Sequence, residues 1–96
     1  LLHAALRNVL GTHVVQRGSV VDADRLRFDF AHDQAMTWDE IRQVEALMNA
    51  EVLRDVPVVI EQKSQAEARE MGAMMLFGEK YGEVVRVVQV PGYSTE

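Results

Sequence analysis

The sequence of 96 residues contains no cysteine, so its residues form neither a disulfide nor a thiolate metal site. That absence suits a cytoplasmic protein. No apolar run approaches the ~20 residues that cross a bilayer, and no segment has the pattern of a signal peptide. What remains is ordinary globular composition, 48% hydrophobic and 26% charged, which argues against disorder. The length suits one modest core, so we expect residues 1–96 to form a single domain.

The sequence also lacks an excess of basic residues. Its 15 acidic residues outnumber its 10 lysines and arginines, which gives a formal net charge of −5. A domain that binds nucleic acid unaided is normally basic, since neutralising phosphates supplies most non-specific affinity. Four arginines do lie in the first third of the chain: Arg7, Arg17, Arg25 and Arg27. The balance disfavours autonomous RNA binding. It leaves RNA open as a substrate that other parts of a larger protein help to hold.

Apolar residues at helical spacing predict a first helix over residues 2–10, which Gly11 ends. No Ser, Thr, Asp or Asn precedes this helix to accept from its first amides. At the other end, the sequence stops shortly after the turn that Pro91 and Gly92 predict. We therefore expect both ends to be interior points of a longer chain.

Two strands joined by a short link are predicted next. Residues 13–21 are rich in β-branched side chains, and residues 25–31 alternate with Leu26, Phe28 and Phe30 on one buried face. The link over residues 22–24 is short enough for a hairpin. Gly18, inside the first strand, indicates either a β-bulge or a close backbone approach at a site.

The clearest helix begins after Thr37, which forms a capping box with Glu40. Met36 and Ile41 are placed as a hydrophobic staple across that start. An apolar stripe follows along the helix: Ile41, Val44, Leu47, Met48 and Val52. Pro57 is expected to end the helix.

The remainder predicts a strand over residues 58–60, a short helix capped by Ser64 and Glu67 and closed by Gly72, and a last strand over residues 83–90. The order of elements predicts an α+β fold. We expect a mostly antiparallel sheet of three to four strands with helices packed on one face.

No complete catalytic or metal site follows from spacing alone. None of His3, His13 and His32 has another ligand type at a spacing that closes a metal site, such as i and i+4 on a helix. His32 and Asp33 could act as a base and its orienting carboxylate, but they follow a strand end and lead into a loop. We interpret all three histidines as structural or surface residues.

Other familiar arrangements are also missing. Ser19 lacks the Gly-x-Ser-x-Gly elbow, and residues 78–82 lack the Gly-Lys-Ser/Thr of a phosphate loop. Asp29 and Asp33 would make a carboxylate pair, but Asp29 alternates with buried phenylalanines. We expect Asp29 to pair with Arg27 or Arg25 instead. The residue chemistry alone leaves the function open.

Four stretches are distinctive together: LLHAALRNVLG at residues 1–11, THVVQRGS at 12–19, LRFDF at 26–30 and GAMMLFGEKYG at 72–82. In order and without gaps, the chain resembles the editing domain of bacterial-type alanyl-tRNA synthetase, of the superfamily shared with threonyl-tRNA synthetase. The last stretch resembles the full synthetase more than the free-standing editing relatives. The resemblance implies a domain that hydrolyses mischarged Ser- or Gly-tRNA(Ala) within the ligase that charges tRNA(Ala) with alanine.

The resemblance also implies zinc, held in the family by a His-x-x-x-His motif before the first stretch and a Cys-x-x-x-His motif after Glu96. Both motifs lie outside residues 1–96, so no metal ligand is assigned within this sequence, and the fragment alone is expected to be inactive. ATP and magnesium are expected only in other domains of the parent. The implied partners are those domains and the acceptor end of tRNA(Ala) with its amino acid, and the implied location is the cytoplasm.

Gln16 and Ser19 match positions in the family's editing pocket, and we predict catalytic roles for both. The Gln16 amide donates and accepts at once, which suits the serine hydroxyl or the attacking water. Gly18 would let the backbone approach the substrate. The competing interpretation is a bulged edge strand whose polar side chains face solvent. Arg27 and Asp29 match a family strand that we interpret as structural.

Two other functions stay open. One is a non-catalytic RNA-binding or scaffold module with the same fold, and the other is a free-standing trans-editing alanyl-tRNA deacylase. A threonyl-tRNA synthetase editing domain ranks behind both, because its family pattern has nothing like residues 72–82.

Overall fold

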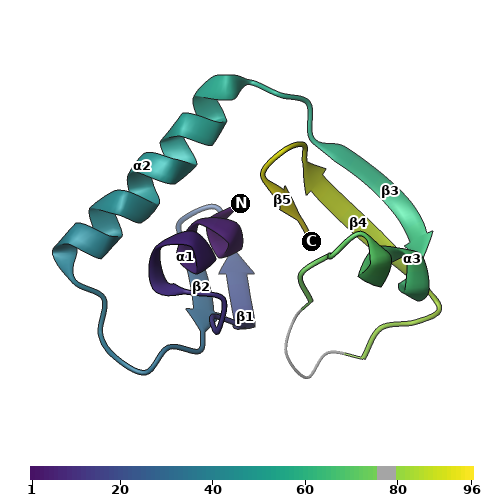
Figure 1. Ribbon diagram of the computed structural model, residues 1–96, viewed down its shortest axis with the longest axis horizontal. Coiled ribbons are helices and arrows are strands. Elements are labelled where there is room, and N and C mark those ends of the chain that lie inside the picture. The colour runs from purple at the N-terminus through teal and green to yellow at the C-terminus, as the bar shows by residue number, and fades with distance from the viewer. Residues whose placement is uncertain (76–79) are drawn as a thin grey trace.

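A computed structural model describes residues 1–75 and 80–96 (Figure 1). Within them, eight elements follow one another: α1 (Leu2–Leu10), β1 (Gln16–Val21), β2 (Leu26–Phe30), α2 (Trp38–Arg54), β3 (Val59–Ser64), α3 (Gln65–Glu70), β4 (Val84–Val90) and β5 (Ser94–Thr95). The predicted α+β class is confirmed. No helix of the described residues has the length and apolar character needed to cross a membrane.

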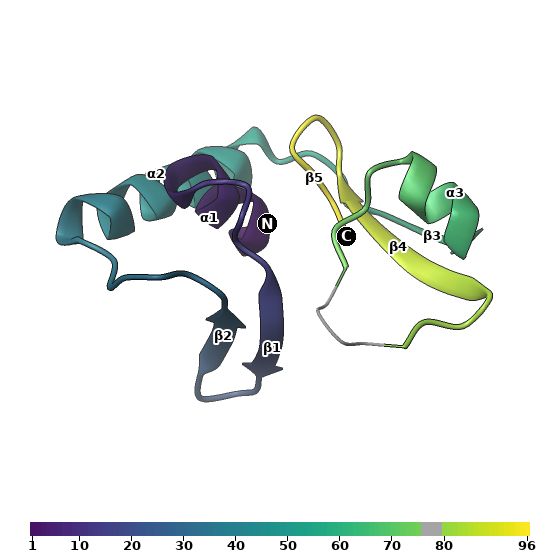
Figure 2. The same ribbon diagram turned by 60° about the horizontal axis from the view of Figure 1, so that its bottom comes forward.

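The strands form two antiparallel sheets, β1–β2 and β3–β4–β5, rather than the one sheet of three to four strands that we expected. Figures 1 and 2 show the two sheets in separate halves, linked by α2, with both chain ends between them. Between the halves, Gln16 of β1 and Glu96 after β5 line the same hollow. The helices accordingly pack in both halves, α1 against α2 and α3 against β3 and β4.

The hairpin has the predicted link and bulge. Asp22 Oδ1 accepts from the amides of Asp24 and Arg25, 2.8 and 2.9 Å away, which closes the turn. The register shifts between Gln16 and Gly18, which confirms the β-bulge. Leu26, expected on the buried face, is 60% exposed, because it is the first residue of β2 after the hairpin turn.

The first strand begins later than predicted, at Gln16 instead of residue 13. Val14 N donates to Gly11 O at 3.3 Å, so the chain turns before it becomes extended. That turn sends the Val14 side chain into the core, where it is fully buried. Burial of an apolar side chain decided the conformation here over β propensity.

The main core lies where α1 crosses α2. Its buried members are Ala5, Leu6, Val14 and Val44, and partly buried side chains surround them, among them Phe28, Phe30 and Met48. The capping box at Thr37 and Glu40 is confirmed by hydrogen bonds in both directions. The apolar stripe of α2 is only partly used, because Val52 is 64% exposed past the end of α1.

Helix α2 ends before the predicted stop. Arg54 is its last residue, and Asp55 takes the left-handed conformation with φ 51°. A left-handed residue at a helix end satisfies a terminal carbonyl, and here the Asp55 amide donates to Val52 O at 3.1 Å. The chain has therefore left the helix two residues before Pro57.

In the second half, β3 is longer than predicted and pairs with β4 from Val59 opposite Gln89 to Ser64 opposite Val84. The capping box of Ser64 and Glu67 is confirmed at the start of α3. The short strand β5 was missed, since two residues carry too little periodicity to be predicted. Residues 76–79, within the stretch 72–82 that carries part of the family resemblance, lie outside the described residues.

Candidate functional site

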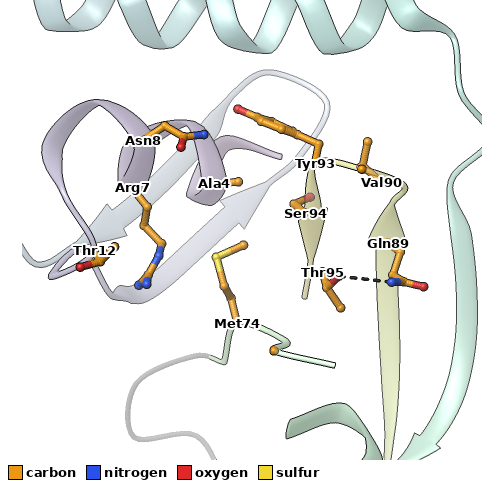
Figure 3. Close-up of a pocket in the computed structure, with 12 residues that line it drawn as sticks. Ala4, Arg7, Asn8, Thr12, Met74, Gln89, Val90, Tyr93, Ser94 and Thr95 are labelled. Atoms are coloured by element: carbon orange, nitrogen blue, oxygen red, sulfur yellow. Dashed lines mark hydrogen bonds between the residues drawn. The ribbon is translucent and has the colours of Figure 1, made fainter. Parts of the chain in front are cut away.

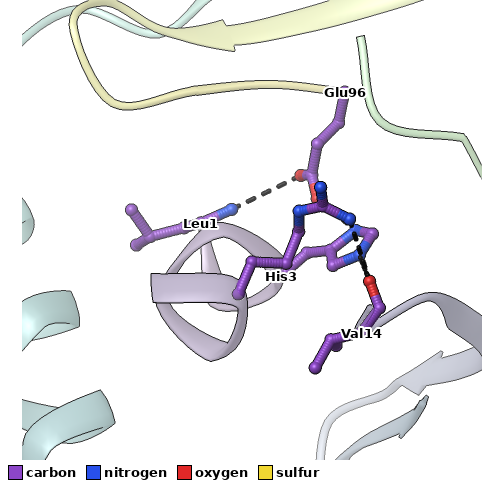
Figure 4. A network of polar contacts seen from close by, with 5 residues as sticks. Leu1, His3, Val14 and Glu96 are labelled. Atoms are coloured by element: carbon purple, nitrogen blue, oxygen red, sulfur yellow. Dashed lines mark hydrogen bonds and ion pairs between the residues drawn. The ribbon is translucent and has the colours of Figure 1, made fainter. Parts of the chain in front are cut away.

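The two ends of the chain meet at Glu96 (Figure 4). The amino group of Leu1 lies 3.4 Å from Glu96 Oε2, and His3 Nδ1 lies 3.7 Å from Glu96 Oε1. Backbone hydrogen bonds in both directions between Glu96 and Val88 hold the carboxyl end against β4. Helix α1 and the end of the second sheet are thus fixed side by side.

His3 is the buried member of this group, with only 3% of its side chain exposed. Its Nε2 lies 3.4 Å from Val14 O, and its ring packs 5.7 Å from the ring of Phe28, centroid to centroid. Arg7 Nη1 also donates to Val14 O, at 3.0 Å. Because both ring nitrogens of His3 have neighbours and the ring is packed, its orientation is fixed.

A hollow of about 220 Å³ opens beside this contact, and we call it the terminal hollow. Gln16 and Ser19 line it together with His3, Phe28 and Glu96. The structure therefore brings two of the residues singled out from the sequence to one place. Gln16 is half-buried and Ser19 is exposed, so both amide and hydroxyl are accessible to a ligand.

Gly18 does not line the terminal hollow. A Cβ atom on Gly18 would lie 3.1 Å from Asp29 Oδ2, closer than ordinary packing allows. Asp29 is held there by Arg27, whose Nε lies 3.0 Å from its Oδ1, as the sequence predicted. In this structure the small size of Gly18 makes room for the ion pair across the bulge.

A second hollow of about 310 Å³ shares Gln16 and Glu96 with the terminal hollow. It extends over α3 and β4, and its lining is mostly apolar, with Met74, Val85 and Val87 among the contributors. Tyr81 and Arg86 add polar groups at its edge. Gln16 therefore stands between two adjoining hollows, each large enough for a small substituent.

A third hollow, of about 500 Å³, lies between α1 and the turn from β4 to β5 (Figure 3). Arg7, Asn8 and Tyr93 line it. Burial raises the pKa of the Tyr93 hydroxyl, and the Asn8 amide lies nearby without reaching hydrogen-bond geometry. No sequence pattern indicated this hollow, because its residues come from segments far apart in the chain.

His13, His32 and Asp33 also come together, although their spacing predicted no cluster. One ligand atom of each lies within 4.8 Å of the others. The turn before β1 and the loop after β2 carry them, and pairing of the two strands is what makes them neighbours. Adjacency across a hairpin is invisible to a search for ligands on one helix face.

Among residues 1–75 and 80–96, those that line the terminal hollow do not make up a metal-binding set. The hollow offers one imidazole, from His3, and one carboxylate, from Glu96, whereas zinc in proteins takes three or four protein ligands. Both His3 nitrogens are moreover placed against other groups, Val14 O and Glu96. The residues present there do not fit zinc by themselves.

No family model matches the chain. Over all 96 residues it is 60% identical to the alanine–tRNA ligases of Staphylococcus aureus strains JH9 and Newman. The chain spans 11% of the length of each of these relatives.

The chain thus matches part of an aminoacyl-tRNA synthetase, a class of enzymes of protein biosynthesis. The particular match is a segment of alanine–tRNA ligase, along the whole of residues 1–96. This confirms the resemblance to alanyl-tRNA synthetase that the four sequence stretches predicted.

Proposed function

We propose that residues 1–96 form one wall of the editing site of an alanyl-tRNA synthetase, which hydrolyses mischarged Ser- or Gly-tRNA(Ala). The observation that carries this proposal is the terminal hollow. Gln16 and Ser19, the two residues that match the family's editing pocket, line it beside both ends of the chain. A pocket wall of this kind would act only when the rest of the site is present.

The proposal includes a zinc ion that is bound by residues outside 1–96. In the family its two ligand motifs precede residue 1 and follow residue 96, and Leu1 and Glu96 lie in contact. Segments continuing from these ends would start side by side, next to Gln16 and Ser19. Bound zinc would supply Lewis-acid chemistry or a fixed point for the substrate.

The residues of this chain can orient a substrate. The Gln16 amide donates through nitrogen and accepts through oxygen, so it can hold a hydroxyl group in a defined direction. Ser19 adds a second hydroxyl contact from the same strand, and the fixed rings of His3 and Phe28 close the wall behind them. This arrangement suits a seryl side chain or a water molecule directed at the ester carbonyl.

The need for such a site follows from the limits of binding. An aminoacylation pocket sized for alanine cannot exclude glycine, because one methyl group is worth only ~1–3 kcal/mol of discrimination. An apolar pocket also rejects an added hydroxyl weakly, so serine enters. Hydrolysis at a second site removes both errors. A hydrogen-bonding residue such as Gln16 would recognise the serine hydroxyl, which the aminoacylation site rejects only weakly.

The proposed substrate is the acceptor end of tRNA(Ala) with its amino acid, and the proposed location is the cytoplasm. The net charge of −5 makes it unfavourable for these residues to hold tRNA alone. Other domains of the parent would supply the affinity for tRNA, as well as the sites for ATP and magnesium.

The test uses the intact ligase that contains this segment. Replacing Gln16→Ala should slow deacylation of Ser-tRNA(Ala) about tenfold, the rate equivalent of one directed hydrogen bond of roughly 1.4 kcal/mol. Charging of tRNA(Ala) with alanine should stay unchanged, because that reaction uses other domains. The matched control is Gln62→Ala, which removes the same side chain from an exposed position on β3.

Equal deacylation rates for Gln16→Ala and Gln62→Ala would remove Gln16 from the site. If the intact ligase binds zinc normally and shows no deacylation at all, the editing proposal fails. The non-catalytic RNA-binding or scaffold function would then be the better account of this segment.

A further inference from the structure

Two imidazoles and one carboxylate face one another on the side of the hairpin that carries Arg17. His13 Nε2 lies 2.8 Å from His32 Nδ1, and the two ring planes differ by 25°. Asp33 Oδ1 lies 3.8 Å from the same His32 nitrogen. All three ligand atoms fall within 4.8 Å of one another, so small movements of the side chains would bring each within bonding distance of a single ion.

The His32 ring is held in place while its partners can adjust. Its side chain is 8% exposed, whereas that of Asp33 is 86% exposed and His13 is also exposed. His32 Nε2 is shielded from water and has no hydrogen-bond partner among the described residues. Nδ1 therefore makes the polar contacts of this buried ring, and it makes them toward His13 and Asp33.

The backbone leaves space for His13 to reach this position. Gly11 has φ 127°, a conformation that other residues rarely adopt. A Cβ atom on Gly11 would lie 2.8 Å from His13 Nδ1, which is too close for the ring to remain. The glycine that ends α1 thus also permits the approach of His13 to His32.

An open hollow of about 490 Å³ surrounds the three side chains, with Arg17 on its wall. This leaves room for an ion with water as its remaining ligands. The Arg17 guanidinium adds positive charge to the same hollow, and that charge opposes the entry of a cation.

We propose that His13, His32 and Asp33 bind a divalent first-row transition ion such as Zn²⁺, at a site separate from the zinc of the proposed editing function. Imidazole with one carboxylate suits these ions, whereas Mg²⁺ and Ca²⁺ prefer sets made only of oxygen. Zn–N bonds of about 2.0–2.1 Å at a tetrahedral angle separate two ligand nitrogens by roughly 3.3 Å. The exposed His13 ring therefore has to withdraw only slightly from its 2.8 Å contact.

The expected affinity is modest. Coordination through His32 Nδ1 places the remaining ring proton on Nε2, which has no acceptor among the described residues. The lack of a hydrogen-bond acceptor for the second nitrogen of a metal-binding histidine typically lowers metal affinity by about 10- to 100-fold. The positive charge of Arg17 lowers the affinity further.

The test is calorimetric titration of Zn²⁺ into the intact protein and its variants, with circular dichroism as the check on folding. His13→Ala should lose one zinc equivalent per chain relative to the wild type. Asp33→Asn should bind that equivalent about tenfold more weakly, and Arg17→Gln should bind it more tightly. The control Asp24→Asn removes an exposed carboxylate from the far end of the hairpin and should bind as the wild type does.

Equal zinc stoichiometry and affinity in the wild type, His13→Ala and Asp33→Asn would overturn the proposal. Zinc held by the editing site stays in all these variants, so only the difference between them reports on this cluster. Loss of Ser-tRNA(Ala) deacylation in Gln16→Ala with normal zinc binding at His13 would support both proposals independently.

Discussion

His3 Nδ1 lies 3.7 Å from Glu96 Oε1, and this contact joins the first turn of α1 to the end of the second sheet. The two partners differ in burial, since 3% of the His3 side chain and 32% of the Glu96 side chain are exposed. The pair thus has one member fixed in the packed interior and one at the rim of the terminal hollow. We expect the two to contribute differently to stability and to function.

Replacing His3→Ala should lower the free energy of unfolding by about 2–4 kcal/mol, because it empties a packed site beside Phe28. Glu96→Gln should cost less than about 1 kcal/mol, because the polar contacts of a half-exposed carboxylate contribute little to stability. Urea denaturation of the intact protein measures both. Similar losses for the two variants would mean that the contact between His3 and Glu96, and not the packing of His3, holds the halves together.

Gly11→Ala should destabilise the protein by roughly 1–3 kcal/mol, because φ 127° strains any other residue and the new Cβ meets the His13 ring. Gly72→Ala is the matched control. It carries the strain of φ 74°, but its Cβ would meet nothing within 4 Å. The imidazole resonances of His13 and His32 should shift in Gly11→Ala and stay in place in Gly72→Ala, as followed by NMR.

Tyr93 makes the free energy of unfolding depend on pH in the alkaline range. Burial raises the pKa of its hydroxyl above the ordinary value of 10.0, so the unfolded chain loses this proton first as pH rises. The free energy of unfolding is therefore constant with respect to this group below pH 10 and falls above it. Tyr93→Phe should remove that part of the decline.

Denaturation at neutral pH and again above the ordinary tyrosine pKa tests this, with the wild type and Tyr93→Phe compared at each pH. At neutral pH the variant should be as stable as the wild type or slightly more so, since the buried hydroxyl has no hydrogen-bond partner among the described residues. A parallel alkaline decline in both proteins would show that Tyr93 does not contribute to it.

Local signals in the sequence predicted most of the elements. The capping boxes at Thr37 and Ser64 placed the starts of α2 and α3, and Gly18 placed the bulge, because each depends on bonds between near neighbours in the chain. The predictions were wrong where tertiary contacts decided the local conformation. Because the Val14 side chain is buried in the core, β1 begins at Gln16 and not at residue 13. Leu26 alternates correctly for a buried strand face, but it follows the hairpin turn directly and is left 60% exposed.

The candidate sites were also predicted only in part from the sequence. The predicted roles of Gln16 and Ser19 came from resemblance, and their common place in the terminal hollow depends on how the hairpin meets α1 and Glu96. His32 and Asp33 are neighbours in the sequence and could be considered as a pair, but the addition of His13 had no sequence signal, since strand pairing brings it to His32 from 19 positions away.

By itself, the sequence determined the α+β class, the capped helices and the relationship to alanyl-tRNA synthetase. These depend on short-range hydrogen bonds, periodic burial and residue identity, which a linear chain displays. Only the tertiary structure divided the strands into two sheets and brought Leu1 and His3 against Glu96. Such contacts depend on which apolar faces pack against each other, and that choice is made by the whole chain at once.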